Sequence, residues 1–169
     1  LVGSEMCIRD SFTFRDVTKF LKDKLTVDLS ASYILQDNKN MIAAGKYFNP
    51  LPALYLFPRG DDFDNVRLYQ RWDESRNLYT QAWDYGSGDM SFQNPYWIMN
   101  KMINQTKKRR YMLSANLKYD VTDWLDVTGR VKVDNADMDI TEKRYAGTDT
   151  NFAGEKGMYS IIKRNDRQI

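Results

Sequence analysis

Three segments of the chain alternate apolar and polar residues with a period of two: residues 25–36, 111–120 and 125–134. Across them, 15 of the 16 odd-numbered residues are apolar and the other is Gly129, whereas 14 of the 16 even-numbered residues are polar. Successive side chains of a β-strand point to opposite faces, so this pattern predicts strands with one apolar and one polar face. A helix has a period of 3.6 residues and would not produce it.

A sheet on the surface of a soluble protein alternates in the same way, so the length of the segments matters. From first to last apolar residue they span nine to eleven residues, longer than the ~5–6 of an ordinary strand and close to the ~9–11 of a membrane strand. Tyr33, Tyr111 and Tyr119 lie near segment ends, where membrane barrels carry aromatic girdles. After Val133 the apolar residues change to even positions, as expected where a strand leaves the hydrocarbon. The sequence therefore favours antiparallel, up-and-down strands of a transmembrane β-barrel, of which this chain holds a part.

Short and long connections alternate along the chain. Two short turns each lead into the motif D-x-L-x-V, at residues 23–27 and 123–127. In contrast, residues 37–110 separate two strong segments, and residues 135–157 form a second long gap. Short periplasmic turns and long extracellular loops are typical of outer-membrane barrels. We therefore expect residues 37–110 to form a long surface loop.

Composition excludes several classes of function. The net charge of +2 is too small to indicate nucleic-acid binding, and the basic run at residues 107–110 is better explained as a charged strand mouth. The chain has no histidine, which removes Ser-His-Asp catalysis and all His-ligated metal sites. Its one cysteine, Cys7, forms neither an intrachain disulfide nor a cysteine-rich zinc site. We expect no catalytic residues, no metal and no cofactor, and hence no enzyme.

The first ten residues differ from the rest of the chain. Residues 1–10 show neither strand alternation nor a helical stripe, and they do not begin with Met. They also resemble the translation of a sequencing adapter. We interpret residues 1–10 as a non-native leader, with a native disordered leader as the alternative, and residues 11–169 as the barrel fragment.

Two groups of side chains are candidates for contact with a solute. In the long loop, aromatic rings offer surfaces for a substrate or a lid, although their packing within the loop is the favoured alternative; these are Trp72, Trp83, Tyr85 and Trp97. On the polar face of the strands, the side chains expected to line a lumen are Asp28, Asn116, Lys118, Asp126, Arg130, Lys132 and Asp134. The acidic residues between positions 61 and 74 match neither a glycosidase pair nor a calcium loop, and we interpret them as solvated charges.

Three stretches carry a resemblance to a known family: LPALYLFPRG at residues 51–60, QNPYW at 93–97 and RYMLSANLKYDVTDWL at 110–125. Together they resemble the SusC/RagA-type TonB-linked outer-membrane transporters of Gram-negative bacteria. The resemblance implies a barrel of roughly 22 strands with a plug, in contact with outer-membrane lipid. It also implies import of oligosaccharides or peptides with a SusD-like surface lipoprotein, energised by TonB through parts that this chain lacks.

The chain then looks like an internal barrel fragment of about five strands, located in the cell outer membrane. The alternative function is a secreted all-β module that binds glycans with its aromatic loop, and a glycosidase is a weaker third option. The apolar face of the strands discriminates between the first two, because it meets lipid in a barrel and a second sheet in a secreted module.

Overall fold

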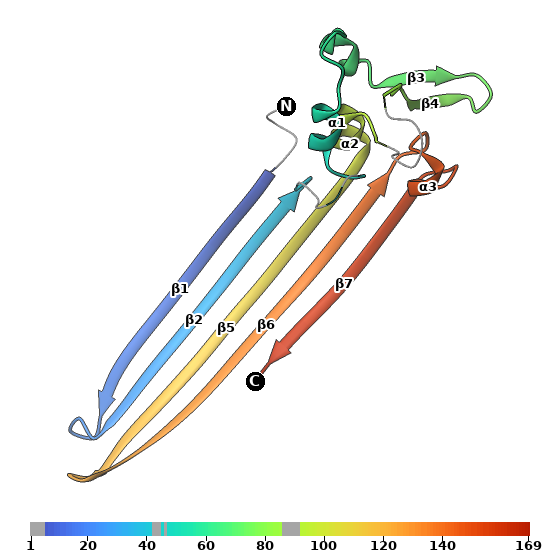
Figure 1. Cartoon of the computed structure of the whole chain (residues 1–169). Coiled ribbons are helices and arrows are strands. Elements are labelled where there is room, and N and C mark those ends of the chain that lie inside the picture. Colours follow the sequence, from blue (N-terminus) through green and yellow to red (C-terminus); the bar gives the residue numbers. More distant parts are fainter. Residues whose placement is uncertain (1–5, 42–44, 46, 86–91) are drawn as a thin grey trace. The chain divides into compact units, whose positions relative to one another are not determined.

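A computed structural model describes residues 6–41, 45, 47–85 and 92–169. In this part of the chain the fold is all-β, dominated by a five-stranded antiparallel sheet with the order β1-β2-β5-β6-β7 (Figure 1). The strands of this sheet are β1 Met6–Phe20, β2 Leu25–Lys39, β5 Met102–Thr122, β6 Leu125–Arg144 and β7 Met158–Gln168. The smaller elements are α1 Pro50–Tyr55, the 3-10 helix η1 Phe63–Arg67, β3 Gln70–Asp73, β4 Leu78–Gln81, α2 Pro95–Lys101 and α3 Thr150–Ala153.

The connection between β2 and β5 is shorter than the sequence predicts. β2 continues to Lys39 and β5 begins at Met102, so the segment outside the sheet is residues 40–101 rather than 37–110. The basic run at residues 107–110 lies inside β5 instead of preceding it. Backbone hydrogen bonds to a neighbouring strand hold a strand together whatever its side chains, so pairing extends β5 beyond its alternating stretch.

The second long gap is also partly strand. β6 runs through the change of apolar phase to Arg144, so the connection to β7 is residues 145–157 rather than 135–157. At the other end of the chain, residues 6–10 belong to β1, although they lack alternation. Residues 1–5 lie outside the described part, and the non-native origin of the leader stays a prediction.

Contacts within the chain group the residues into two compact units. The sheet unit comprises residues 8–37, 106–139 and 163–169, and it contains most of the length of β1 and β2. The loop unit comprises residues 38–105 and 140–162 together with residues 1–7. It contains the helices and the two-stranded sheet of β3 and β4.

In the sheet unit, cross-strand contacts define two faces. The N–H of Asp120 donates to the Lys24 carbonyl at 2.8 Å, and the hydroxyls of Ser30 and Ser114 lie 2.7 Å apart. Both contacts fit one register, in which residues of like parity face each other across β2 and β5. Even-numbered side chains of these strands therefore share a polar face, and odd-numbered side chains share the apolar face.

The loop unit has a core of its own around α2. Trp97, Ile98 and Met102 are buried, and Phe48 and Tyr69 pack against them. Asn94 caps α2 by accepting a hydrogen bond from the N–H of Tyr96 at 2.9 Å, and Pro95 occupies the first turn, where no N–H is needed. The same Asn94 amide donates to the carbonyls of Val66 at 2.9 Å and Ala82 at 3.1 Å. One buried side chain thereby ties α2 to two other segments.

Gly147 allows the β6–β7 connection to approach β4 closely. Its φ is +95°, and a Cβ placed there would lie 2.2 Å from the Tyr79 carbonyl oxygen. Its own carbonyl accepts a hydrogen bond from the N–H of Gln81 at 3.1 Å. A larger residue would be strained by the positive φ, and its Cβ would clash with the Tyr79 carbonyl oxygen, so this position requires glycine.

Candidate functional site: two opposed faces of the sheet

The apolar face of the sheet unit presents large side chains to its surroundings. Leu117 is 49% exposed and Val131 is 61% exposed. Other exposed members of this face on β2, β5 and β6 are Leu29, Tyr33, Leu113, Tyr119, Val121, Leu125 and Val127. Large exposed apolar patches on proteins often mark interaction surfaces, so this face is a candidate for contact with an apolar partner.

Strand β1 adds aromatic rings to the same face. The hydroxyls of Thr13 and Ser32 lie 3.2 Å apart on the polar face, so the even-numbered residues of β1 lie on the apolar face. These include Phe12, Phe14 and Phe20, each at least half exposed. The sequence signal for this strand was weak because Asp16 and Thr18 interrupt the apolar series.

Hydrogen bonds join side chains of neighbouring strands on the polar face. Arg15 on β1 donates to both carboxylate oxygens of Asp28 on β2, at 3.1 and 2.9 Å. The Oδ1 of Asn116 on β5 accepts from the Nε of Arg130 on β6 at 2.6 Å. Two arginines of this face are thereby held by acceptors on the adjacent strands.

The other predicted lumen residues either form ion pairs with nearby residues or are exposed. Arg110 forms a two-point ion pair with Asp134, with its Nε 2.8 Å from Oδ1. Lys118 pairs with Asp120 at 3.2 Å. Asp126 and Lys132 are exposed on the same strand face.

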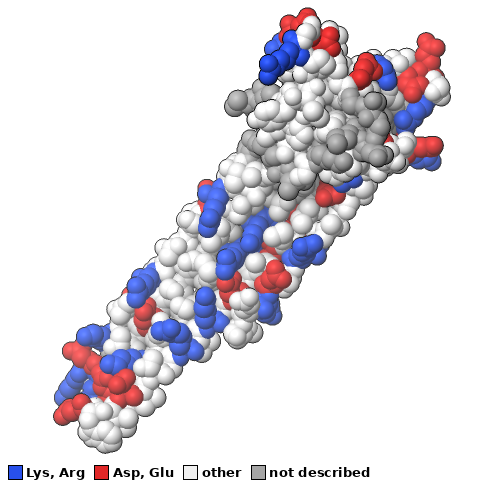
Figure 2. Space-filling view, viewed as in Figure 1, with Lys and Arg blue, Asp and Glu red and all other residues white. Residues whose placement is uncertain are grey.

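The sequence predicts that the carboxylates Asp28 and Asp134 line the polar face, but it does not predict their arginine partners. Arg15 lies in the weakly patterned β1, and Arg110 was assigned to a basic run before the strand. Cross-strand register alone brings each arginine to its carboxylate. Figure 2 shows basic and acidic side chains interspersed along the visible surface of the strands.

The four aromatic candidates of the loop do not form one site. Trp97 is 1% exposed, and its indole N–H donates to the Thr148 hydroxyl at 3.0 Å, which leaves no surface for a substrate or lid. Trp83 and Tyr85 pack together with ring centroids 5.0 Å apart. Only Trp72 is half exposed, and its ring meets Tyr79 edge-on. Packing within the loop therefore accounts for most of this aromatic set.

Burial in this loop also affects ionisation. Desolvation, followed by a hydrogen bond with Asp61, raises the pKa of the Tyr85 hydroxyl. The ring of Tyr85 lies 5.0 Å from that of Phe57, in an edge-on contact. Tyr85 thus acts as a packed, neutral side chain at ordinary pH.

Within the described residues, no group of three or more acidic, histidine or cysteine side chains is arranged to hold a metal ion. None of the described helices combines the length and the apolar character that a membrane-crossing helix needs. No family model, curated protein or solved structure matches this chain.

Proposed function

We propose that this chain forms part of the wall of a TonB-dependent importer in the outer membrane of a Gram-negative cell. The observation that carries the proposal is that very long strands have one apolar face and one polar face. β5 has 21 residues and β6 has 20, whereas ~9–11 residues suffice to cross a bilayer. Over residues 25–36, 111–120 and 125–134, one face of the sheet exposes apolar side chains and the other holds paired or solvated charges. Further along β5 and β6, the odd-numbered residues Arg109 and Asp139 form an ion pair.

Each face suits one environment of a barrel wall. Lipid offers no hydrogen bonds, so a face in contact with it must be apolar, as the face with Leu117 and Val131 is. A water-filled lumen tolerates charges that are paired or solvated, as are Arg15 with Asp28 and Arg130 with Asn116. A soluble sandwich would bury the apolar face against a second sheet.

The proposed substrates are oligosaccharides or peptides, and the proposed partner at the cell surface is a SusD-like lipoprotein. Two short turns, between β1 and β2 and between β5 and β6, lie at the periplasmic ends of the strands in this proposal. The helices and the β3–β4 hairpin would then lie on the extracellular side, where a substrate or lid approaches. The proposed coupling to TonB runs through other parts of the importer.

A secreted glycan-binding module is the second candidate, and one observation favours it. Trp72 and Tyr79 face each other on the β3–β4 hairpin with ring centroids 5.1 Å apart, and both are about half exposed. Exposed aromatic faces are suitable platforms for sugar rings. This module would act in water and would need no lipid contact.

Lipid contact can be measured with one label on each face. Leu117 and Lys118 are neighbours in β5 with similar exposure, about half in each case, and they lie on opposite faces. Each is replaced by a fluorophore-labelled cysteine in a Cys7→Ser chain bound to vesicles whose lipids carry a nitroxide in the acyl tail. We expect strong quenching at position 117 and weak quenching at position 118.

Two results would contradict the importer proposal. One is equal quenching at positions 117 and 118. The other is a chain that is monomeric in plain buffer and unfolds cooperatively without detergent. If such a monomer also binds a maltooligosaccharide and loses this binding in Trp72→Ala, the secreted module is the better description.

A further inference from the structure

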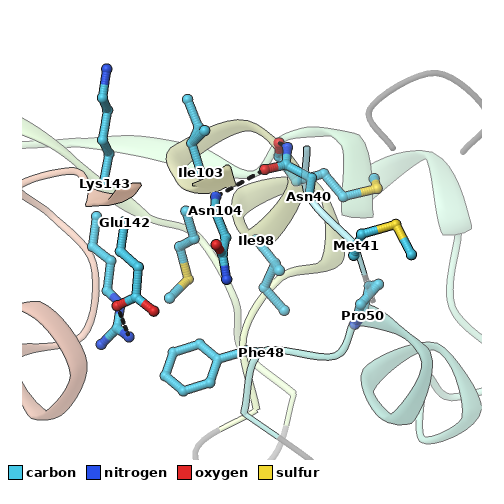
Figure 3. Close-up of a pocket in the computed structure, with 12 residues that line it drawn as sticks. Asn40, Met41, Phe48, Pro50, Ile98, Ile103, Asn104, Glu142 and Lys143 are labelled. Carbon is cyan, nitrogen blue, oxygen red and sulfur yellow. Dashed lines mark hydrogen bonds and ion pairs between the residues drawn. The ribbon is translucent and has the colours of Figure 1, made fainter. Parts of the chain in front are cut away.

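A small pocket opens in the loop unit between the end of β2, helix α2 and the last residues of β6 (Figure 3). Its volume is about 240 Å³. Sites for drug-sized ligands have volumes of about 300–1,000 Å³. The pocket therefore has room for one amino-acid residue or one sugar ring, but not for a whole oligosaccharide.

The walls of the pocket are mainly apolar. Ile98 and Met102 are buried residues of the α2 core, and Met41 and Met99 add flexible thioether side chains that adapt to the shape of a ligand. The pocket has one aromatic ring, Phe48. This lining suits an aliphatic or aromatic side chain rather than a hydroxyl-rich sugar.

Arg144 and Phe152 contact the Phe48 ring, and Arg144 also pairs with a neighbouring carboxylate. The Arg144 guanidinium lies 4.5 Å from the Phe48 ring centroid, and the Phe152 ring packs edge-on against Phe48. Arg144 also pairs with Glu142 at 3.5 Å. Arg144 thus covers one face of the Phe48 ring. Glu142 and Arg144 pair with each other, and the third charged residue of the lining, Lys143, has its ammonium 5.7 Å from the Tyr159 ring centroid and points away from Phe48 in Figure 3. None of these charges is left to select a charged ligand.

Asn104, an exposed residue, supplies a polar group at the mouth of this apolar space. Its N–H donates to the Asn40 Oδ1 at 3.1 Å, and its carbonyl accepts from the N–H of Asn40 at 2.7 Å. The Asn40 amide also donates to the Met99 carbonyl at 3.0 Å, which fixes the position of Asn104 relative to α2. In Figure 3 the Asn104 side chain extends toward Phe48, between Glu142 and Ile98.

Among the described residues, the side-chain amide of Asn104 has no hydrogen-bond partner. A primary amide offers two donors and an acceptor, so it can form a reciprocal pair of hydrogen bonds with the backbone N–H and C=O of one extended residue. A peptide ligand combines this backbone group with an apolar side chain within the volume of one residue.

We propose that this pocket binds one uncharged, apolar residue of a peptide, with Asn104 pairing with its backbone. Binding at this pocket does not depend on the membrane. The further statement that the importer transports peptides rather than sugars rests on the proposed importer function.

Methionine methyl groups give a local reading of binding. The full chain, labelled with ¹³C at the methionine methyls, is held in lipid nanodiscs, or in plain buffer if it proves soluble. N-acetyl-leucinamide is the probe, and N-acetyl-serinamide and maltose are the comparison ligands. We expect the leucine probe to shift the methyl signals of Met41, Met99 and Met102, and to leave those of Met112 and Met138 in the sheet unit unchanged.

A pair of variants tests the role of the amide. Asn104→Ala should weaken binding of the leucine probe about five- to a hundredfold, the equivalent of two lost hydrogen bonds. Asn100→Ala, the same change at an exposed residue of α2, should leave the affinity unchanged. Unchanged signals of Met112 and Met138 confirm that each variant is folded.

Three outcomes would overturn the proposal: no shift at the pocket methionines, equal shifts with maltose or the serine probe, or the same affinity for Asn104→Ala and Asn100→Ala. None of these outcomes bears on lipid contact, which is measured at positions 117 and 118. Failure of the pocket and failure of the importer function are therefore distinguishable.

Discussion

Replacing Val131 by arginine tests whether lipid or water contacts the apolar face. Val131 is six residues beyond Leu125, where β6 begins after the short turn. At ~3.3 Å per residue this is about 20 Å along the strand, and a tilt of ~40° reduces it to about 15 Å of depth. In the proposed importer, with the hydrocarbon boundary at Leu125, this is half of the ~30 Å hydrocarbon core, so the new guanidinium would lie near the midplane.

The two environments predict very different costs. Val131 is 61% exposed, so in water the change would alter the free energy of unfolding by no more than about 0.5 kcal/mol. Near the midplane of a bilayer, a lipid-facing arginine costs ~2–4 kcal/mol. The two costs differ by at least about 1.5 kcal/mol, which corresponds to a more than tenfold difference in the unfolding equilibrium constant.

Thr128→Arg is the matched control, because Thr128 is an exposed residue of the polar face of the same strand. The assay is urea unfolding of the vesicle-inserted protein, followed by tryptophan fluorescence. We expect a large loss of stability for Val131→Arg and a small one for Thr128→Arg. Equal losses would show that the faces are assigned wrongly, and no loss for Val131→Arg would show that its face meets water.

Three further predictions address the topology, the loop core and the hairpin. In a chain with Cys7→Ser, a membrane-impermeant thiol reagent should label Gly60→Cys on intact cells, because a Cβ at position 60 has no other atom within 4 Å. It should label Thr122→Cys only after the outer membrane is opened. The reverse pattern would invert the topology. Thr148→Val removes the acceptor of a buried indole N–H and should lower the free energy of unfolding of the loop unit by about 1–3 kcal/mol in a denaturant titration, whereas an unchanged midpoint would argue against the buried contact. Hydrogen bonds from Ser75, its hydroxyl first, lower the pKa of Asp73, so their stabilisation is present above the usual carboxyl pKa of ~3.9 and is lost as the pH falls through the lowered value. Amide exchange in the β3–β4 hairpin, corrected for intrinsic rates, should therefore quicken in acid, and Asp73→Asn should remove most of this pH dependence.

The aromatic residues of the loop show where pattern reasoning ends. Nothing in the sequence separates Trp97, which is buried, from Trp72, which is half exposed. Their difference arises from distant partners: Thr148 receives the indole N–H of Trp97, and Tyr79 pairs with Trp72 across a hairpin. Such partners are set by the path of the chain, which no local spacing encodes. The pocket beside Asn104 was missed for the same reason, because β2, α2 and β6 each contribute part of it.

The sequence by itself determined the existence of the main strands and the polarity of their two faces. This follows from covalent geometry, because successive side chains of an extended backbone must point in opposite directions, and Leu117 and Lys118 therefore belong to opposite faces in any sheet. Only the tertiary structure decided how far the strands extend and which charges meet. Backbone pairing carries β6 to Arg144 although its side-chain pattern changes after Val133. Cross-strand register brings Arg15 to Asp28, because hydrogen bonding between strands depends on a neighbour that is remote in the sequence.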